Sequence, residues 1–514
     1  MASTPIEQYA FLSDGQTGAL VSEAGSIDWL CFPRFDSEAL FTALLGTEEH
    51  GRWLMAPRDG TLLSRTYRGD TFILDSEWET PTGKVTITEF MPINVGEMTS
   101  SDLVRTATCT EGTVEIVHDL RFRFNYGASV PWVERAELHG QPCLTAIAGP
   151  TAIHLVGPLP DPEGYSHGGT FTLGEGEAES WHMLWSPSYE PAPQLEPIDM
   201  LETVTEANWS SWASRIDAEG PYADEIVRSL LILRSLTDTK TGGIVAAATT
   251  SLPEEFGGSR NWDYRYTWLR DSSLTIEALV AHGFTDGARA WRDWLLRAIA
   301  GDSHSLRIMY GLGGERHLPE FELDHLPGYE NSAPVRIGNG AAGQFQGDVV
   351  GEVMIALDKL RKAGVADDHR SWALQKELLI FAEENLDRKE HGIWEMRGDL
   401  HYFTHSRVMI WAAFDRAIKA VEDHGFDGPV DHWKALRARL ADEIEEKGWN
   451  DEINSYTQTY GSTEVDASLL QLPRLATWTT TIRACCPPWQ RSRKTSLTIK
   501  DSSTGTAPSP ARTG

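Results

Sequence analysis

The chain has 514 residues, which is enough for two or three domains with cores of their own. Its formal charge of −30 at pH 7 excludes nucleic acid and anionic membranes as partners, because both would be repelled. The amino-terminal residues lack a basic segment followed by an apolar one, and no stretch reaches about 18 apolar residues. The five cysteines have neither a disulfide pattern nor metal-ligand spacing. We therefore expect a reduced, cytoplasmic protein.

The first two hundred residues show the period-two pattern of β-strands. In the segment KVTITEF at 84–90, Val85 and Ile87 alternate with threonines. Turns rich in Gly, Pro and Asp separate such segments, which is typical of antiparallel sheets. We predict an antiparallel β-sandwich domain over residues 1–215, with the Pro-rich segment 187–197 close to its end.

Beyond Pro221 the apolar residues recur with the period of an α-helix. The first candidate helix begins with Pro221 and acidic residues, as helix starts do. Eight candidates follow one another, near residues 221–236, 271–282, 291–299, 353–360, 374–381, 411–421, 433–447 and from 464. Eight helices joined by short and long loops in alternation predict four hairpins of a helical toroid over residues 216–475.

The segment NWDYRYTWLRDSS, residues 261–273, combines aromatic and charged side chains at the expected start of a helix. Arg270 and Asp271 would offer neighbouring donors and acceptors, which suit two adjacent sugar hydroxyls. Tyr264 and Trp268 would supply an aromatic wall for a sugar ring. The alternative is a helix start with Asp271 as its cap and the aromatic residues in the core.

A long loop rich in Gly and Pro extends over residues 310–346. Loops of this length inside a compact domain are usually functional or disordered, and its aromatic, His and Arg content favours order. Arg336 and Asn339 are candidate ligands of sugar hydroxyls. The loop also holds four acids that compete for a catalytic role, namely Glu315, Glu320, Glu322 and Glu330.

The segment HGIWEMRG, residues 391–398, places Trp394 beside Glu395 in a turn bounded by glycines. The indole face could keep Glu395 protonated, so that it acts as a general acid. The alternative is an exposed acid that follows a buried tryptophan. No histidines have zinc-ligand spacing on one helix face, and no nucleophile elbow is present, so neither a metal nor a serine mechanism is expected.

Several of these segments together resemble glycoside hydrolase family 15, the family of glucoamylases, glucodextranases and actinobacterial α,α-trehalases. The matching segments are FLSDGQTGALVSEAGSIDWLCFPRFDS, SLPEEFGGSRNWDYRYTWLRDS, GERHLPEFELDHLPGYENSAPVRIGNGA, GIWEMRG and YGSTEVDASLL, in this order. The resemblance covers the chain up to about Leu475. The long loop is most similar to that of the trehalase branch.

The resemblance implies a β-sandwich followed by an (α/α)6 barrel, of which residues 216–475 would supply the first eight helices. The residues that would grip or line the glucose pocket are Tyr264, Trp268, Arg270, Asp271, Arg336 and Trp394. Glu395 would be the general acid of an inverting hydrolase, and no cofactor or metal is implied. A second carboxylate, roughly 6.5–9.5 Å away, would activate water as the general base. In the family this base lies between the last two barrel helices, so we expect it to be absent here.

The segment after Leu475 departs from the family pattern. Residues 476–514 hold a single acid, Asp501, whereas the preceding 475 residues hold the other 74. The segment has no helical period and ends in a Ser/Thr/Pro/Gly/Ala tail, which predicts a non-homologous, disordered terminus. Reading the codons one base earlier allows an acidic, helical sequence here, so a frameshift near Leu475 is a second hypothesis.

We predict a hydrolase that releases glucose from α-glucosides, most closely trehalose, and whose activity is impaired by the loss of the base. A glucoamylase or glucodextranase that acts on α-glucan ends is the alternative within the family. Two alternatives lie outside hydrolysis. One is a non-catalytic sugar-binding remnant, and the other is a phosphorolytic glucosidase, in which phosphate would replace the base.

Overall fold

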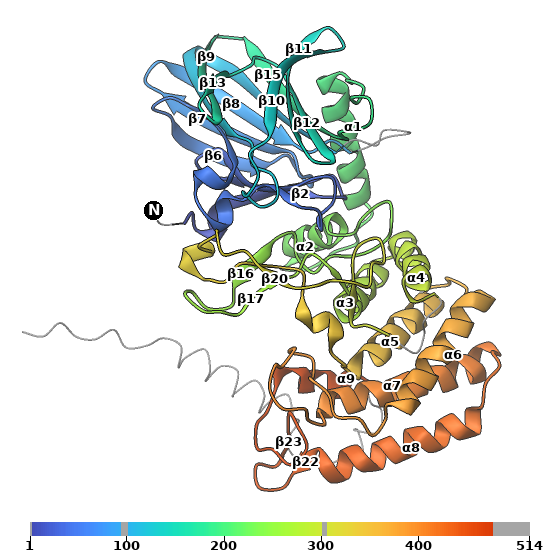
Figure 1. Cartoon of the computed structure of the whole chain (residues 1–514). Coiled ribbons are helices and arrows are strands. Elements are labelled where there is room, and N and C mark those ends of the chain that lie inside the picture. Colours follow the sequence, from blue (N-terminus) through green and yellow to red (C-terminus); the bar gives the residue numbers. More distant parts are fainter. Residues whose placement is uncertain (1–2, 94–100, 301–305, 476–514) are drawn as a thin grey trace, which may run out of the picture. The chain divides into compact units, whose positions relative to one another are not determined.

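The computed structural model describes residues 3–93, 101–300 and 306–475 of the chain (Figure 1). Its internal contacts divide the chain into two compact units. The first unit comprises Met1–Thr267, Ala281–Trp291 and Tyr310–Gly340. The second comprises Trp268–Val280, Arg292–Met309 and the residues from Ala341 onward. The boundary that the sequence places at residue 215 stays a prediction.

The first unit is built mainly from antiparallel strands that all belong to one connected network (Figure 1). The strands are β1 Tyr9–Ser13, β2 Gly18–Ser22, β3 Ser26–Cys31, β4 Ala39–Phe41, β5 Arg52–Pro57, β6 Thr61–Tyr67, β7 Leu74–Thr80, β8 Gly83–Phe90, β9 Asp102–Arg121, β10 Trp132–Leu138, β11 Gln141–Ala148, β12 Thr151–Val156, β13 Asp161–Glu163, β14 Ser166–Gly174 and β15 Ala178–Pro187. The predicted antiparallel β domain is therefore confirmed.

Strand β9 joins two sheets because its two halves have different neighbours. Up to Gly112 it pairs with β8 and β15, and the second sheet continues from β15 through β12 and β11 to β10. Beyond Gly112 it pairs with β5 and β14, in the sheet that begins with β1. Trp53, Ile116 and Trp181 lie in the apolar core of this unit and are fully buried. The sheets therefore share one strand and one core.

The predicted side-chain alternation holds in β8, where Val85 and Ile87 are buried while the threonines between them are partly exposed. Helix α1, Ile198–Ala213, follows the Pro-rich segment and was not predicted. It lies along the sheets (Figure 1), where Trp209 packs against Phe72 with ring centroids 4.8 Å apart. Only four of its sixteen residues are buried. A helix that buries so few residues needs few apolar side chains, and the helical period in its sequence is therefore weak.

The predicted helices between Pro221 and Gly448 are present. Their bounds are α2 Ala223–Ser235, α3 Leu269–Ala281, α4 Thr285–Ile299, α5 Asp348–Lys362, α6 His369–Glu384, α7 Thr404–His424 and α8 Val430–Lys447. The eighth candidate begins as the 3-10 helix η7, Ala467–Gln471, and continues as α9, Leu472–Leu475. Further short strands are β16 Thr250–Pro253, β17 Asn261–Asp263, β18 Thr267–Trp268, β19 Met309–Tyr310, β20 Phe321–Glu322, β21 Arg336–Ile337, β22 Trp449–Asn450 and β23 Ser455–Tyr456. A helical carboxy-terminal part is thus confirmed.

Helices α5 and α7 pack closely against each other in the second unit, and nearly all residues of α5 are buried. A Cβ on Gly351 would stand 2.2 Å from the Met409 carbonyl, so only glycine allows this approach. Gly351 and Met409 lie near the amino-terminal ends of their helices, and those two ends therefore meet. The positive ends of the two helix dipoles face the same region, which contains the candidate site.

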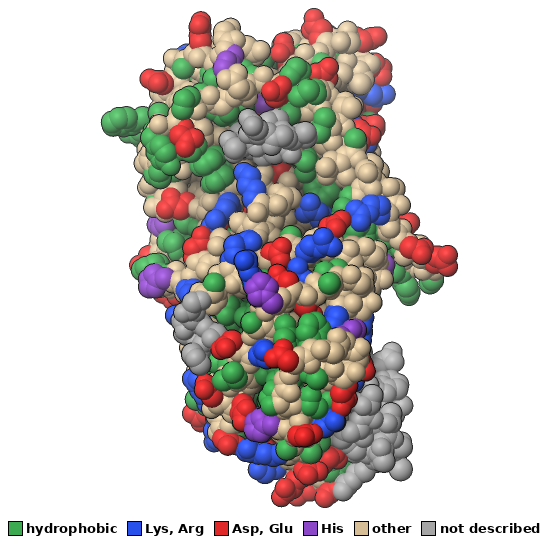
Figure 2. All heavy atoms as spheres, turned by 90° about the vertical axis from the view of Figure 1, so that its right-hand side faces the viewer, with side chains coloured by type: hydrophobic (Ala, Val, Ile, Leu, Met, Phe, Trp, Pro, Cys, Tyr) green, Lys and Arg blue, Asp and Glu red, His purple; other side chains and the backbone are tan. Residues whose placement is uncertain are grey.

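No helix among the described residues is both long and apolar enough to cross a membrane. On the face drawn in Figure 2, acidic and basic side chains are interspersed, and no continuous basic surface covers it.

Candidate active site

The aromatic segment 261–273 is divided between the two units, and its first part forms a closed ion pair in the first unit. Arg265 donates to the two carboxylate oxygens of Asp263 at 2.7 and 2.9 Å. It also donates to the Ser37 carbonyl and to the Tyr126 hydroxyl, both at 2.8 Å. The Arg265 and Asp263 side chains are 1% and 0% exposed. This pair is satisfied within the protein and has a structural role.

Tyr264 and Arg336, two of the predicted sugar-binding residues, also lie in the first unit. Tyr264 is partly buried. Arg336 donates to the Ser259 carbonyl at 2.7 Å and to the Glu322 carboxylate at 3.0 Å. Its guanidinium group also lies over the Trp262 ring, 4.6 Å from the centroid. Protein groups thus already engage Arg336, and a role of either residue in sugar binding stays a prediction.

The second part of the segment starts helix α3 in the second unit and places Arg270 in a polar cluster. Nη1 of Arg270 donates to Gln346 Oε1 at 2.8 Å and to Asp348 Oδ2 at 3.1 Å. The Asp271 carboxylate lies 3.8 Å from Arg270 Nε, and its side chain is 44% exposed. Burial opposes the charge of Arg270, but Asp348 and then Asp271 raise its pKa, so it remains a cation. The partly open Asp271 leaves this cluster with acceptors for a ligand.

Glu395 lies in a tight turn with an unusual backbone. Its φ angle is +53°, in the left-handed region that residues other than glycine seldom adopt. Gly392 in the same turn has φ +69°, and a Cβ there would stand 2.6 Å from the Phe403 ring. A bridge between Glu390 and His401 closes the base of the turn. The surrounding structure thus holds Glu395 in a strained conformation, a feature that is concentrated at functional sites.

The carboxyl group of Glu395 is held by an indole that is distant in sequence. Trp268 Nε1 donates to Glu395 Oε1 at 2.7 Å, and Trp268 is 1% exposed. Burial raises the pKa of Glu395 above its ordinary value, although the Trp268 hydrogen bond and the Arg270 charge act in the opposite direction. A carboxyl group with a raised pKa keeps its proton at higher pH, as a general acid must.

Trp394 contacts a different group from the one that the sequence suggested. Its indole Nε1 donates to Asp466 Oδ2 at 2.6 Å, and the side chain is 47% exposed. Asp466 also accepts from Gln458 Nε2 at 2.8 Å and from the Ser468 amide at 2.7 Å. The hydrogen bond to the carboxyl group of Glu395 therefore comes from Trp268, while the indole of Trp394 is tied to the start of η7. Sugar binding by Trp394 stays a prediction.

Three further residues belong to the cluster, and the sequence analysis did not identify them. They are Gln344 and Gln346, in the loop before α5, and Asp348, the first residue of that helix. Gln346 Nε2 donates to Gln344 Oε1 at 3.2 Å, and Gln344 Nε2 donates to the Glu395 carbonyl at 3.4 Å. The two glutamines carry no charge and follow no known spacing, so no local signal in the sequence marked them.

Glu390 is a second buried acid near Glu395. It is 3% exposed, and its Oε2 accepts a hydrogen bond from the Gly347 amide. Burial, followed by the nearby charge of Asp348, raises the pKa of Glu390 to about 8. Glu390 is therefore protonated and neutral at pH 7, and it fixes the backbone between Gln346 and Asp348.

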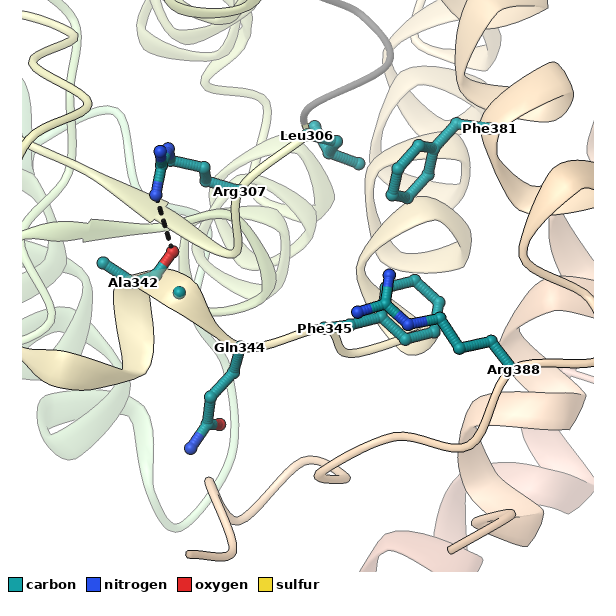
Figure 3. A pocket seen from close by; sticks show the side chains of 8 residues that line it. Leu306, Arg307, Ala342, Gln344, Phe345, Phe381 and Arg388 are labelled. Carbon is teal, nitrogen blue, oxygen red and sulfur yellow. Dashed lines mark hydrogen bonds between the residues drawn. The ribbon is translucent and has the colours of Figure 1, made fainter. Parts of the chain in front are cut away.

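A cavity of about 360 Å³ opens beside the Gln344 amide in the second unit (Figure 3). Arg307 donates to the Ala342 carbonyl at 3.1 Å on one side, and Arg388 lies 4.3 Å from the centroid of the Phe345 ring on the other. The remaining lining residues are Leu306, Gly343 and Phe381. The Gln344 side chain thus has the Glu395 turn as one neighbour and this cavity as the other.

The four competing acids of the long loop all have partners within the first unit. Glu315 pairs with Arg34 at 3.2 Å, and the Glu330 carboxylate accepts from the Ser3 amide at 3.1 Å. The other two, Glu320 and Glu322, lie 3.7 and 3.0 Å from the Arg336 guanidinium. Across the described ranges, no group of three or more His, Cys, Asp and Glu residues could hold a metal ion. None of these four acids lies in the cluster of Arg270 and Glu395, and the role of Glu395 as the general acid stays a prediction.

Sequence profiles of known families match both parts of the chain. The profile of the glycosyl hydrolases of family 15 matches residues 220–506, and the trehalase-like amino-terminal profile matches residues 1–131. The chain belongs to glycoside hydrolase family 15. The matched range extends into the segment after Leu475, which lies outside the described residues. The predicted tail and the predicted absence of a general base therefore stay predictions.

Relatives within family 15 are similar over most of the chain. The trehalase of Mycolicibacterium smegmatis is 34% identical over 525 residues, which cover 97% of this chain and 77% of the relative. The trehalase of Mycobacterium tuberculosis is 34% identical over 494 residues, covering 91% and 72%. That of Thermoplasma volcanium is 32% identical over 483 residues, covering 91% and 75%. The chain is thus similar to trehalases from both bacteria and archaea.

A solved bacterial glucoamylase in complex with acarbose has a similar structure, with a TM-score of 0.59. It is 12% identical, and the match covers 91% of this chain and 71% of that one. At this identity the likeness concerns the fold alone. It agrees with a β domain followed by the helical hairpins of a family 15 hydrolase.

Proposed function

We propose that this chain is an inverting glycosidase that cleaves trehalose, with Glu395 as its general acid. The observation that carries the proposal is the Glu395 carboxyl group, which is held by the Trp268 indole at 2.7 Å beside Arg270 and Asp271. Its raised pKa supports proton donation to the glycosidic oxygen. Membership of family 15 supports hydrolysis, and the trehalases among the relatives support the substrate.

Arg270 and Asp271 would grip the glucose whose bond is broken. Arg270 supplies donors and Asp271 supplies acceptors, so two adjacent hydroxyls can be bound together. Proton transfer from Glu395 would convert the second glucose into a neutral leaving group. An attacking water would arrive from the opposite face of the ring, so the attacked ring would be released as β-glucose and the leaving ring as α-glucose. NMR detection of α-glucose alone, before mutarotation, would contradict inversion.

The Glu395→Gln variant tests the assignment of the acid. It keeps the size of the side chain and an acceptor for Trp268 but cannot donate the catalytic proton. We expect turnover of trehalose to fall about 10²–10⁴-fold, with little change in trehalose affinity. Glu315→Gln, which removes a partly exposed acid of the first unit, is the matched control and should retain activity. Equal losses in both variants, or faster cleavage of maltose than of trehalose, would contradict the proposal.

We further propose that residues 1–514 contain no general base, so that this polypeptide hydrolyses trehalose slowly. The proposal is supported by the resemblance, which places the base beyond the eighth helix, and by Asp501 being the one acid after Leu475. Loss of a catalytic base costs about 10²–10⁴ in rate.

Azide provides a direct test because it attacks carbon without needing deprotonation. In the expected reaction azide bonds to C1 of one glucose, the C1–O bond breaks, and the Glu395 proton passes to the departing oxygen. The products are β-glucosyl azide and glucose, and turnover should rise at least about tenfold with azide. Fast hydrolysis without azide would place a base within the chain, and Asp271, which is electrostatically coupled to Glu395, would be the first residue to replace.

A further inference from the structure

Two glutamines connect the sugar-binding part of the cluster to the backbone of the proposed acid. Arg270 donates to Gln346 Oε1, Gln346 donates to Gln344 Oε1, and Gln344 donates to the Glu395 carbonyl. The four residues come from three segments that are distant in the sequence, and all belong to the second unit. These three hydrogen bonds form one directed relay, in which each of the two amide side chains both accepts and donates.

The direction of this hydrogen-bond relay is fixed by its first and last groups. The Arg270 guanidinium can only donate, so the oxygen of the Gln346 amide must face it. The Glu395 carbonyl can only accept, so the nitrogen of the Gln344 amide must face the carbonyl. The amide of Gln346 is 2% exposed and is therefore shielded from competing water. Each amide consequently has a single orientation, and a reversal of either one would break two hydrogen bonds.

The point of attachment at Glu395 is mechanically significant. The φ angle of +53° makes this backbone strained, and a strained turn persists only when several contacts restrain it. Trp268 restrains the carboxyl group of Glu395, and Gln344 restrains its carbonyl. Figure 3 shows the Gln344 side chain pointing away from the Phe345 ring.

We infer that Gln344 and Gln346 are positioning residues that couple sugar binding at Arg270 to the placement of the general acid Glu395. This inference rests on the proposed function. When a sugar hydroxyl binds Arg270, any displacement of the guanidinium group is passed through the amides of Gln346 and Gln344 to the Glu395 turn. The relay thereby aligns the proton donor with a bound substrate, and misplacement of a reacting group by about 1 Å can cost about 10² in rate.

Methionine substitutions separate the two ends of the relay. Gln344→Met removes the bond to the Glu395 carbonyl, so turnover of trehalose with azide should fall about tenfold or more while trehalose affinity changes little. Gln346→Met removes the acceptor for Arg270, so trehalose affinity should also fall about tenfold. Gln346→Glu keeps that acceptor and should recover part of the affinity. The double methionine variant should lose less than the product of the two single losses.

Gln375 provides a matched control because it makes the same kind of bond elsewhere in the second unit. It is fully buried on α6, and its Oε1 accepts from Arg361 Nη2 at 2.8 Å. Gln375→Met should lower the melting temperature about as much as Gln346→Met does. It should leave trehalose affinity and turnover within about twofold of the original chain. Thermal unfolding therefore distinguishes a positioning role from a merely structural one.

An NMR readout keeps the test independent of catalysis. The Trp268 indole N–H donates to Glu395, so its ¹⁵N resonance should shift with pH as Glu395 ionises. Its assignment follows from its disappearance in Trp268→Phe. Gln344→Met and Gln346→Met should each move this resonance and raise the pH at which its shift is half complete, because Arg270 is less firmly held near Glu395. Gln375→Met should change neither the resonance nor this pH.

The outcomes separate the two proposals. If the original chain turns over no trehalose even with azide, while the indole resonance responds to both glutamine variants, the relay stands and the proposed function fails. If trehalose is turned over but Gln344→Met and Gln346→Met behave like Gln375→Met in affinity, rate and resonance, the relay is overturned.

Discussion

The segment 261–273 contains two Arg–Asp pairs that the structure uses in different ways. Asp263 and Arg265 are buried and satisfied by protein groups. Arg270 is held by Asp348 and Gln346, but Asp271 beside it remains 44% exposed. Residue types alone do not distinguish the two pairs. The number of acceptors left open to a ligand does, and for this reason we propose a sugar-binding role for the second pair only.

The largest effect on stability and on trehalose binding is expected when the two Arg–Asp pairs are broken one at a time. Arg265→Met leaves Asp263 buried without its partner and should lower the free energy of unfolding by about 3–5 kcal/mol. Arg270→Met should also destabilise the chain, because Asp348 loses its partner. Trehalose should raise the melting temperature of the original chain and of Arg265→Met, but not that of Arg270→Met. Stabilisation of Arg270→Met by trehalose would contradict the functional role of the second pair.

A smaller effect on stability is expected from the buried acid Glu390 in the second unit, and it depends on pH. Asp263 has Arg265 as a partner, whereas Glu390 retains its proton, with a pKa raised to about 8 from 4.5. Between these pH values the unfolded chain releases the proton while the folded chain keeps it, so stability falls as pH rises, by up to about 1.4 kcal/mol per unit. Glu390→Gln removes this titration.

Chemical denaturation of Glu390→Gln and of the original chain at several pH values measures the difference. The variant should gain stability relative to the original chain from pH 5 to pH 8, and the gain should level off above pH 8. A difference that does not change with pH would mean that Glu390 is ionised in the folded chain.

The third prediction concerns the pH dependence of the proposed acid. Trp268→Phe removes the N–H that stabilises ionised Glu395, so the pKa of Glu395 should rise further. The alkaline limb of trehalose turnover with azide should move to higher pH, by about one unit. Trp291→Phe is the control and should leave the limb in place, because the buried indole N–H of Trp291 has no hydrogen-bond partner among the described residues. A shift to lower pH would contradict the assigned hydrogen bond.

The smallest effect comes from an exposed pair next to the same segment. Arg260 and Glu254 lie 2.6 Å apart, with side chains 56% and 44% exposed. Exposed ion pairs contribute about 0–1 kcal/mol, so Arg260→Gln should hardly change the melting temperature. A loss as large as that of Arg265→Met would show that proximity within the segment, rather than burial, decides the cost.

Local patterns in the sequence predicted the elements well. The alternation of Val85 and Ile87 gave a strand with the correct buried face, and the helical period after Pro221 gave helices at the expected places. Helix α1 was missed because a helix that covers a sheet with only four of its residues has almost no apolar period. Both results follow from how much of each element is buried.

The candidate site was predicted less completely because its contacts join distant parts of the sequence. Motifs identified Arg270 and Glu395, since neighbouring residues carry those signals. The partner of Glu395 proved to be Trp268, which is 127 residues away, rather than the adjacent Trp394. Gln344 and Gln346 carry no charge and follow no known spacing. Their role depends on a tertiary arrangement that local sequence does not encode.

The long strand β9 has a consequence for how the first unit tolerates insertions and deletions. Because both sheets share this strand, loss of one residue before Gly112 would invert the inward and outward faces of the β9 residues that pair with β8 and β15, while the other sheet kept its register. The same loss after Gly112 would invert the faces of the β9 residues that pair with β5 and β14. Length changes should therefore be accepted at the partner switch itself, where Gly112 has φ +71°, and rejected on either side of it.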